Sequence, residues 1–202
     1  MNFRNFFHQI AIHLFYHILH VKNKIITSVA KRNDTLIDYA VGKAGDMSKW
    51  INSNLSFVFG IDIAKDNIHN PLDGACARYL IKKKQIPNLF YALFVNGNSG
   101  LNIRSGAAMP SELGLEKDKQ ITKAVFGSGP KDSTLIGKGV SDVYGIGSNG
   151  FNISSCQFAL HYMFQDRRTV HEFMRNLSEC TNMNGYFIIT HNDNTFIFRF
   201  IT

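Results

Sequence analysis

Strand-like apolar runs alternate with helix-like segments from residue 35 onward, and this alternation limits the possible folds more than any other feature of the sequence. The strand-like runs are TLIDYA (35–40), SFVFGID (56–62), NLFYALFV (88–95), FNISSCQF (151–158), GYFIITH (185–191) and TFIFRFIT (195–202). Helical segments are expected at 46–53, 71–84, 116–124 and 166–180. Strands that alternate with helices favour the α/β class, with a mostly parallel, Rossmann-like sheet covered by helices on both faces.

The length of the chain suits one domain with a short N-terminal arm. The 202 residues are 45% hydrophobic, which is typical of a globular domain. We assign residues 1–30 to a helical arm and residues 31–202 to the main domain. Histidines interrupt the apolar N-terminal stretch, which contains no run of about 18 apolar residues, so neither a signal peptide nor a membrane span is predicted.

The charge balance favours an anionic partner. The formal net charge is +7, which suits nucleic acid or a phosphate-rich ligand, although a basic protein without such a partner remains an alternative. The three cysteines form no CxxC pair. Neither a disulfide framework nor a zinc finger is therefore expected, and a reducing, intracellular compartment is favoured.

Two patterns of histidine and cysteine suggest chemistry that the rest of the sequence does not favour. His13, His17 and His20 would share one face of a helix and could bind zinc, but there is no HExxH pattern. A polar helix edge is the favoured interpretation, and no metal is expected. Cys156 would point away from Gln157 on a strand, which favours a small buried group over a nucleophile.

Polar residues follow the carboxyl ends of the first four expected strands. Gly42 and Lys43 follow the first strand, Asp62 ends the second, residues 96–99 follow the third, and residues 157–162 end and follow the fourth. Ligands of open parallel sheets bind outside the carboxyl ends of the strands. We therefore expect these residues to form one shared site.

The spacing of Gly42 and Asp62 favours an adenosine-containing cofactor. Glycine lets a ligand approach the backbone closely, and an acidic residue 20 positions later, at the end of the second strand, can accept hydrogen bonds from both ribose hydroxyls. The turn matches neither GxGxxG nor a P-loop. A plain tight turn and a helix N-cap at Asp62 remain alternatives, as does an enzyme that uses NAD.

Three motifs resemble one family of enzymes. The motifs are DYAVGKAGD (38–46), GIDIA (60–64) and SCQFALHY (155–162). Together they resemble the mRNA cap guanine-N(7) methyltransferases, and most closely the forms in large nucleocytoplasmic DNA viruses. The resemblance covers roughly residues 20–190. It implies a class I S-adenosylmethionine-dependent methyltransferase fold and transfer of a methyl group to the guanine of a GpppN cap.

The resemblance also implies two sets of ligand contacts. The cofactor-binding set is Lys22, Ala40, Gly42, Asp62, Asn98, Gln157 and Tyr162, and the cap-binding set is Lys43, His161 and Tyr162. In this scheme Asp62 binds the ribose, Asn98 stands near the adenine, and Tyr162 borders both ligands. The cofactor is S-adenosyl-L-methionine, and the RNA partner is the capped 5′ end of mRNA.

The chemistry of this reaction explains why no catalytic triad or carboxylate pair is expected. The sulfonium methyl is already activated, and the guanine N7 attacks with a free lone pair and loses no proton. Catalysis then depends on alignment of the two substrates and on the local electric field, and we assign no general base.

The sequence departs from the family in two places. Ile18 stands where family members usually have Asn, and the chain ends at Thr202, before the last strands of the family's sheet. We therefore expect a C-terminally truncated domain whose fifth strand has an unprotected edge. A degenerate, non-catalytic module that binds RNA or a capping partner is the alternative function.

Expected partners also include other capping-enzyme domains or subunits, with no membrane. A viral protein is expected in the host cytoplasm, in viral factories, or in the virion, and a cellular one in the nucleus.

Overall fold

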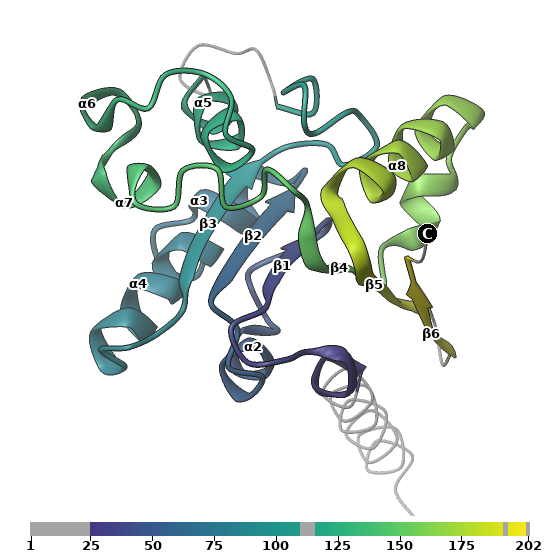
Figure 1. Ribbon diagram of the computed structural model, residues 1–202, viewed down its shortest axis with the longest axis horizontal. Coiled ribbons are helices and arrows are strands. Elements are labelled where there is room, and N and C mark those ends of the chain that lie inside the picture. The colour runs from purple at the N-terminus through teal and green to yellow at the C-terminus, as the bar shows by residue number, and fades with distance from the viewer. Residues whose placement is uncertain (1–24, 110–115, 192–193, 201–202) are drawn as a thin grey trace, which may run out of the picture.

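The computed structural model describes residues 25–109, 116–191 and 194–200, and within them the strands form one mixed sheet (Figure 1). Its order is β3-β2-β1-β4-β5-β6. The strands are β1 (Thr35–Asp38), β2 (Phe57–Asp62), β3 (Tyr91–Asn96), β4 (Phe151–Gln157), β5 (Thr181–His191) and β6 (Asn194–Arg199). Strands β1 to β5 are parallel, and β6 runs antiparallel to β5. The expectation of a mostly parallel, Rossmann-like α/β sheet is confirmed.

Helices connect the strands and cover both faces of the sheet. They are α2 (Met47–Asn52), α3 (Lys65–His69), α4 (Ala75–Gln85), α5 (Glu116–Val125), α6 (Ser133–Ile136), α7 (Lys138–Ser141), the 3-10 helix η1 (Leu160–Phe164) and α8 (Arg167–Cys180). The helices expected near residues 46–53, 116–124 and 166–180 are present. The helix expected from residue 71 begins later, at Ala75. Most of residues 1–30 lie outside the described part of the chain, so the helical arm stays a prediction.

The sheet separates two hydrophobic layers. Because successive side chains of a strand point to opposite faces, Ile37 of β1 lies in one layer and Leu36 in the other. The first layer is closed by α5 and α8, with Phe173 of α8 fully buried. The second is closed by α2, α3 and α4, with Trp50 of α2 fully buried. All six residues of β2 are buried, as expected for a central strand of a parallel sheet.

The strand order reverses between β1 and β4. The chain proceeds outward from β1 through β2 to β3, and then returns to the other side of β1 to form β4. Two neighbouring connections therefore leave the sheet in opposite directions, which opens a crevice at the carboxyl ends of β1 and β4. This topology places the ends of the first four strands around one opening.

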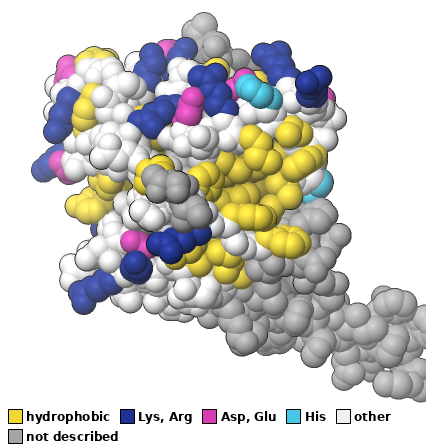
Figure 2. Space-filling model, turned by 45° about the vertical axis from the view of Figure 1, so that its right-hand side comes forward, with side chains coloured by type: hydrophobic (Ala, Val, Ile, Leu, Met, Phe, Trp, Pro, Cys, Tyr) yellow, Lys and Arg dark blue, Asp and Glu magenta, His cyan; other side chains and the backbone are white. Residues whose placement is uncertain are grey.

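The sixth strand corrects one expectation. β5 has no unprotected edge, because β6 pairs with it over residues 186–191 in antiparallel register. Among the described residues, the edge strand on this side of the sheet is β6, where Phe196, Ile197 and Phe198 are 50%, 44% and 53% exposed. Figure 2 brings forward the side with α8, β5 and β6 and shows a broad area of hydrophobic side chains there. The exposed apolar edge is therefore β6, one strand beyond the edge of β5 that the sequence predicted.

Gly60 in the middle of β2 generates a test of the packing. A Cβ atom at this position would lie 2.7 Å from Phe94 Cδ1 and 2.8 Å from Val41 Cγ2. We expect Gly60→Ala to lower the free energy of unfolding by about 1–3 kcal/mol, because the added methyl overpacks the layer. Urea denaturation measures this. Gly139→Ala is the control, since its Cβ meets nothing within 4 Å; an equal loss in both variants would contradict the packing described here.

The exposed edge of β6 generates a second test. An edge strand with apolar side chains and free backbone groups favours pairing between chains. We expect Ile197→Lys to reduce concentration-dependent association in light scattering while the circular dichroism spectrum stays unchanged. Leu80→Lys on α4, where Leu80 is also exposed, should not have this effect. Equal concentration-dependent association of the wild type and both variants in light scattering would contradict the role of the edge.

Candidate functional site

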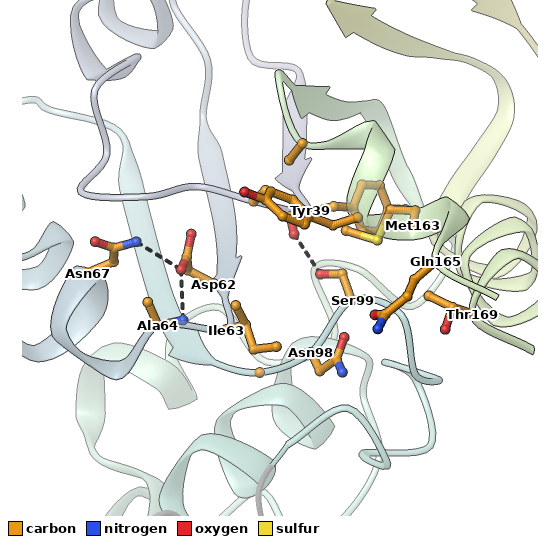
Figure 3. A pocket seen from close by; sticks show the side chains of 14 residues that line it. Tyr39, Asp62, Ile63, Ala64, Asn67, Asn98, Ser99, Met163, Gln165 and Thr169 are labelled. Carbon is orange, nitrogen blue, oxygen red and sulfur yellow. Dashed lines mark hydrogen bonds between the residues drawn. The ribbon is translucent and has the colours of Figure 1, made fainter. Parts of the chain in front are cut away.

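A cavity of about 420 Å³ lies at the carboxyl ends of the strands. Its lining comes from the segments after β1, β2 and β3 and from η1 with the start of α8; the residues are Tyr39, Ala40, Asp62, Ile63, Ala64, Asn67, Gly97, Asn98, Ser99, Ala159, Tyr162, Met163, Gln165 and Thr169. Figure 3 shows Asp62 and Asn67 on one side and Gln165 and Thr169 on the other. The volume falls within the range of about 300–1,000 Å³ that is usual for small-molecule sites.

Asp62 organises one side of the cavity. Its Oδ1 accepts hydrogen bonds from the Ala64 backbone N at 2.9 Å and from Asn67 Nδ2 at 3.0 Å, and its Oδ2 accepts one from the Gly42 backbone N at 2.8 Å. The predicted association of Gly42 with Asp62 is thus a direct hydrogen bond. The N-cap alternative is wrong, because the N-cap of α3 is Ala64.

The carboxylate of Asp62 keeps capacity for a ligand. A carboxylate oxygen can accept two hydrogen bonds, and Oδ2 accepts only one within the described part of the chain. Gly42 beside it has a φ of +55°, and a Cβ atom there would meet nothing within 4 Å. Glycine therefore provides both the turn conformation and open space next to the acid.

The loop after β3 forms a second wall. Asn98 Oδ1 accepts a hydrogen bond from the Gly100 backbone N at 2.9 Å. Its Nδ2 has no hydrogen-bond partner among the described residues, so this donor is available inside the cavity. Ser99 Oγ donates to the Tyr39 backbone O at 2.7 Å (Figure 3). The loop is thereby tied to the end of β1.

Aromatic residues of η1 lie at the mouth of the cavity. Tyr162 lines the cavity and is still 66% exposed. Its ring centroid lies 4.0 Å from that of the exposed His161, which is outside the lining. Met163 is buried and adds an apolar contact to the lining. The arrangement offers a flat, amphipathic surface beside a partly apolar cavity.

Gln157 does not reach the cavity. Its side chain is buried, its Oε1 accepts a hydrogen bond from Thr190 Oγ1 at 2.5 Å, and its Nε2 lies 3.3 Å from Ser155 Oγ and 3.4 Å from the Ile188 backbone O. The amide is satisfied between β4 and β5. Its predicted contact with the cofactor stays a prediction that this placement does not support.

Lys43 is occupied by two carboxylates. Its Nζ lies 2.8 Å from both carboxylate oxygens of Asp73 and 3.3 Å from Asp66 Oδ2. The hydrogen bond to Asp73, followed by that to Asp66, raises the pKa of Lys43. A cap phosphate would have to compete with these two carboxylates for Lys43. The side chain also lies outside the cavity lining. Lys22, Ile18 and the histidines at 13, 17 and 20 lie outside the described residues.

Several lining residues escaped the sequence analysis. Ala40, Asp62, Asn98 and Tyr162 were expected and do line the cavity, as do Gly97, Ser99 and Ala159 from the expected segments 96–99 and 157–162. The lining residues that were not identified include Tyr39, Asn67, Met163, Gln165 and Thr169. Tyr39 and Met163 are direct neighbours of expected residues, which was a usable signal. Gln165 and Thr169 carried no signal, because only the turn from η1 into α8 brings them to the opening.

Other reactive chemistry finds no support in the described part of the chain. Burial raises the pKa of the Cys156 thiol to about 12, and the side chain is fully buried, which confirms a structural role. Residues 25–109, 116–191 and 194–200 contain no group of three or more His, Cys, Asp or Glu placed to hold a metal ion. Over the same residues, no helix has the length and apolar character to span a membrane.

Comparison with known proteins identifies a family over the whole chain and relatives over most of it. The sequence model of the mRNA (guanine-N(7))-methyltransferase domain matches residues 1–202. The chain is 28% identical over 177 residues to a probable mRNA-capping enzyme of Acanthamoeba polyphaga mimivirus. It is 24% identical over 181 residues to mRNA cap guanine-N(7) methyltransferase 1 of Oryza sativa subsp. japonica. It is 29% identical over 158 residues to the mRNA cap guanine-N(7) methyltransferase of Drosophila melanogaster.

These alignments cover most of the chain but a smaller part of each relative. They cover 88% of the chain and 14% of the mimivirus protein, 89% and 38% for the rice protein, and 78% and 29% for the Drosophila protein. The chain thus spans less than two-fifths of the length of these relatives. The viral match agrees with the expected resemblance to large DNA viruses. Because the family model matches residues 1–202, the chain belongs to the mRNA (guanine-N(7))-methyltransferase domain family.

Proposed function

We propose that the chain is a catalytic domain that transfers a methyl group from S-adenosyl-L-methionine to N7 of the guanine in a GpppN cap. The observation that carries the proposal is the cavity at the carboxyl ends of the strands, with Asp62 on one wall, Asn98 on the next and the exposed ring of Tyr162 at its border. A donor and a planar acceptor can meet there.

The residues of the cavity fit the methyl donor. Asp62 Oδ2 retains a free acceptor position for a ribose hydroxyl, and Asn98 Nδ2 offers a donor on the neighbouring wall. Ile63 and Met163 provide apolar surface for an adenine ring, and Ala40 leads into the open turn for the methionine portion. When bound, S-adenosyl-L-methionine supplies the activated methyl group.

The acceptor side has the features of a base-binding surface. Tyr162 and His161 present exposed aromatic rings, and RNA bases that are not paired are commonly bound by stacking on such rings. The net charge of +7 favours approach of the anionic cap and transcript. Because Asp73 and Asp66 already hold Lys43, we assign the phosphate attraction to the overall charge rather than to this one side chain.

The mechanism needs orientation and no proton transfer to or from the attacking atom. Guanine N7 has a lone pair and carries no proton, so the side chains of the site serve to hold the two reactants in line and to exclude water. Asp62 sits at a fixed position through its three backbone and side-chain donors. Such preorganised groups stabilise a moving charge without having to reorient during the reaction.

The place of action and the partners follow from the proposed reaction. The chain would work beside other capping-enzyme domains or subunits, in viral factories or virions for a viral protein and in the nucleus for a cellular one.

Methyl transfer from labelled S-adenosylmethionine to GpppG-ended RNA is the direct test of this function. We expect label to appear at N7 of the cap guanine, because the cavity leaves donor and acceptor adjacent. RNA that already carries a methyl group at N7 is the matched control and should accept none. Binding of both ligands without transfer would support the degenerate, non-catalytic module instead.

Asp62→Ala tests the cofactor site. We expect S-adenosylhomocysteine to bind about 5–150-fold more weakly in calorimetry, since a hydrogen bond to a charged group contributes about 1–3 kcal/mol. Asp34→Ala is the control, because Asp34 holds the Lys31 backbone N at the opposite end of β1. Unchanged affinity in Asp62→Ala would place the ribose elsewhere, and tighter binding of NAD than of S-adenosylhomocysteine would favour the alternative Rossmann-like enzyme.

A further inference from the structure

Three buried residues, of which Tyr39 and Ser99 line the cavity and Asn176 does not, form a closed ring of hydrogen bonds. Tyr39 Oη donates to the Asn176 backbone O at 3.3 Å, Asn176 Nδ2 donates to the Ser99 backbone O at 2.8 Å, and Ser99 Oγ donates to the Tyr39 backbone O at 2.7 Å. The exposed fraction is 1% for Tyr39, 0% for Asn176 and 3% for Ser99. The ring joins the end of β1, the loop after β3 and helix α8.

Asn176 also holds the rest of the loop. Its Nδ2 donates a second hydrogen bond to the Leu101 backbone O at 2.8 Å, and its Oδ1 accepts one from the Ile103 backbone N at 2.9 Å. One amide therefore satisfies three backbone groups between residues 99 and 103. If the loop moved, these buried groups would lose their hydrogen-bond partners, which disfavours any other position of the loop.

The contact between the loop and α8 is close along the helix. A Cβ atom at Gly100 would lie 2.7 Å from Thr169 Cγ2, so the loop backbone packs directly on the helix. Asn98, whose Oδ1 is bonded to the Gly100 N, is therefore held on the same support. The loop has one well-defined position relative to β1, and the donor Asn98 Nδ2 is placed with it.

We propose that Asn176 is a positioning residue for the methyl-donor cavity, acting through Ser99 and the loop at 97–103. Asn176 is not part of the cavity lining, whereas Ser99 and Asn98 are. The proposal rests on the proposed function, in which this cavity binds the methyl donor. Tyr162 and His161 belong to η1 and lie outside the ring, so the ring acts on the donor and not on the cap.

The sequence alone gave no indication of this role. Asn176 lies in the middle of α8, 77 residues from Ser99 and 137 from Tyr39, where Asn is a neutral or unfavourable choice for a helix. A buried Asn in a helix that satisfies backbone groups of a different segment stabilises one arrangement of that segment.

A double-mutant cycle on binding of S-adenosylhomocysteine tests the proposal. Asn176→Ala and Ser99→Ala should each weaken binding about tenfold in calorimetry, as for loss of one hydrogen-bonded contact. Because both changes open the same ring, the double variant should also be about tenfold weaker, and not about a hundredfold weaker as for independent sites. Asn152→Ala, which removes bonds to Thr35 at the opposite end of β1, should leave binding unchanged.

The kinetic readout separates positioning from a general loss of stability. In methyl transfer assays, the KM for S-adenosylmethionine should rise about tenfold in Asn176→Ala, with the KM for capped RNA unchanged. An equal rise in both KM values, or a multiplicative loss of affinity in the double variant, would overturn the proposal. If Asn176→Ala does not fold, Tyr39→Phe takes its place in the cycle with Ser99→Ala. This change removes the donor to the Asn176 O, together with the hydrogen bond between Tyr39 Oη and Ser154 Oγ.

Two outcomes distinguish this proposal from the function on which it rests. If the wild-type chain binds S-adenosylhomocysteine and Asn176→Ala binds it within about twofold, the positioning role alone is overturned. If the wild-type chain does not bind S-adenosylhomocysteine, the proposed function is overturned, and the positioning role with it.

Discussion

The carboxylate of Asp62 is the interaction on which the site depends. Its two oxygens accept hydrogen bonds from Gly42, Ala64 and Asn67, so one side chain joins the turn after β1 to the end of β2 and to α3. Burying a charge is costly unless it is hydrogen-bonded. The same donors that satisfy the charge also fix the first two segments of the cavity, with one acceptor position remaining for a ligand.

The polar residues of the rim divide into two groups. Gln157 and Lys43 bind other groups of the protein. Gln157 accepts a hydrogen bond from Thr190, and Lys43 pairs with Asp73 and Asp66. Asn98 and Tyr162 keep polar or aromatic surface directed at the cavity. A polar residue at the end of a strand therefore does not by itself indicate a ligand contact, because the neighbouring strand or helix can satisfy it first.

The sequence predicted most of the fold and about half of the site for identifiable reasons. Apolar runs located the strands, and the polar residues after them identified the rim, including Asp62 and Asn98. The start of α4 was expected at residue 71 and lies at Ala75. The pairing of β6 was missed because a local pattern contains no information about strand partners. Gln165, Thr169 and Asn176 were missed for the same reason: their roles depend on contacts made across the fold.

The sequence by itself determined the alternation of strands and helices, the mostly parallel direction of the strands and the family of the domain. These follow from local apolar patterns and contiguous motifs. What only the tertiary structure decided is which polar groups remain available. Asn176 and Ser99 are 77 residues apart and meet through a hydrogen bond of 2.8 Å. The satisfaction of a buried polar group is a property of its neighbours in space, and the chain acquires those neighbours only by folding.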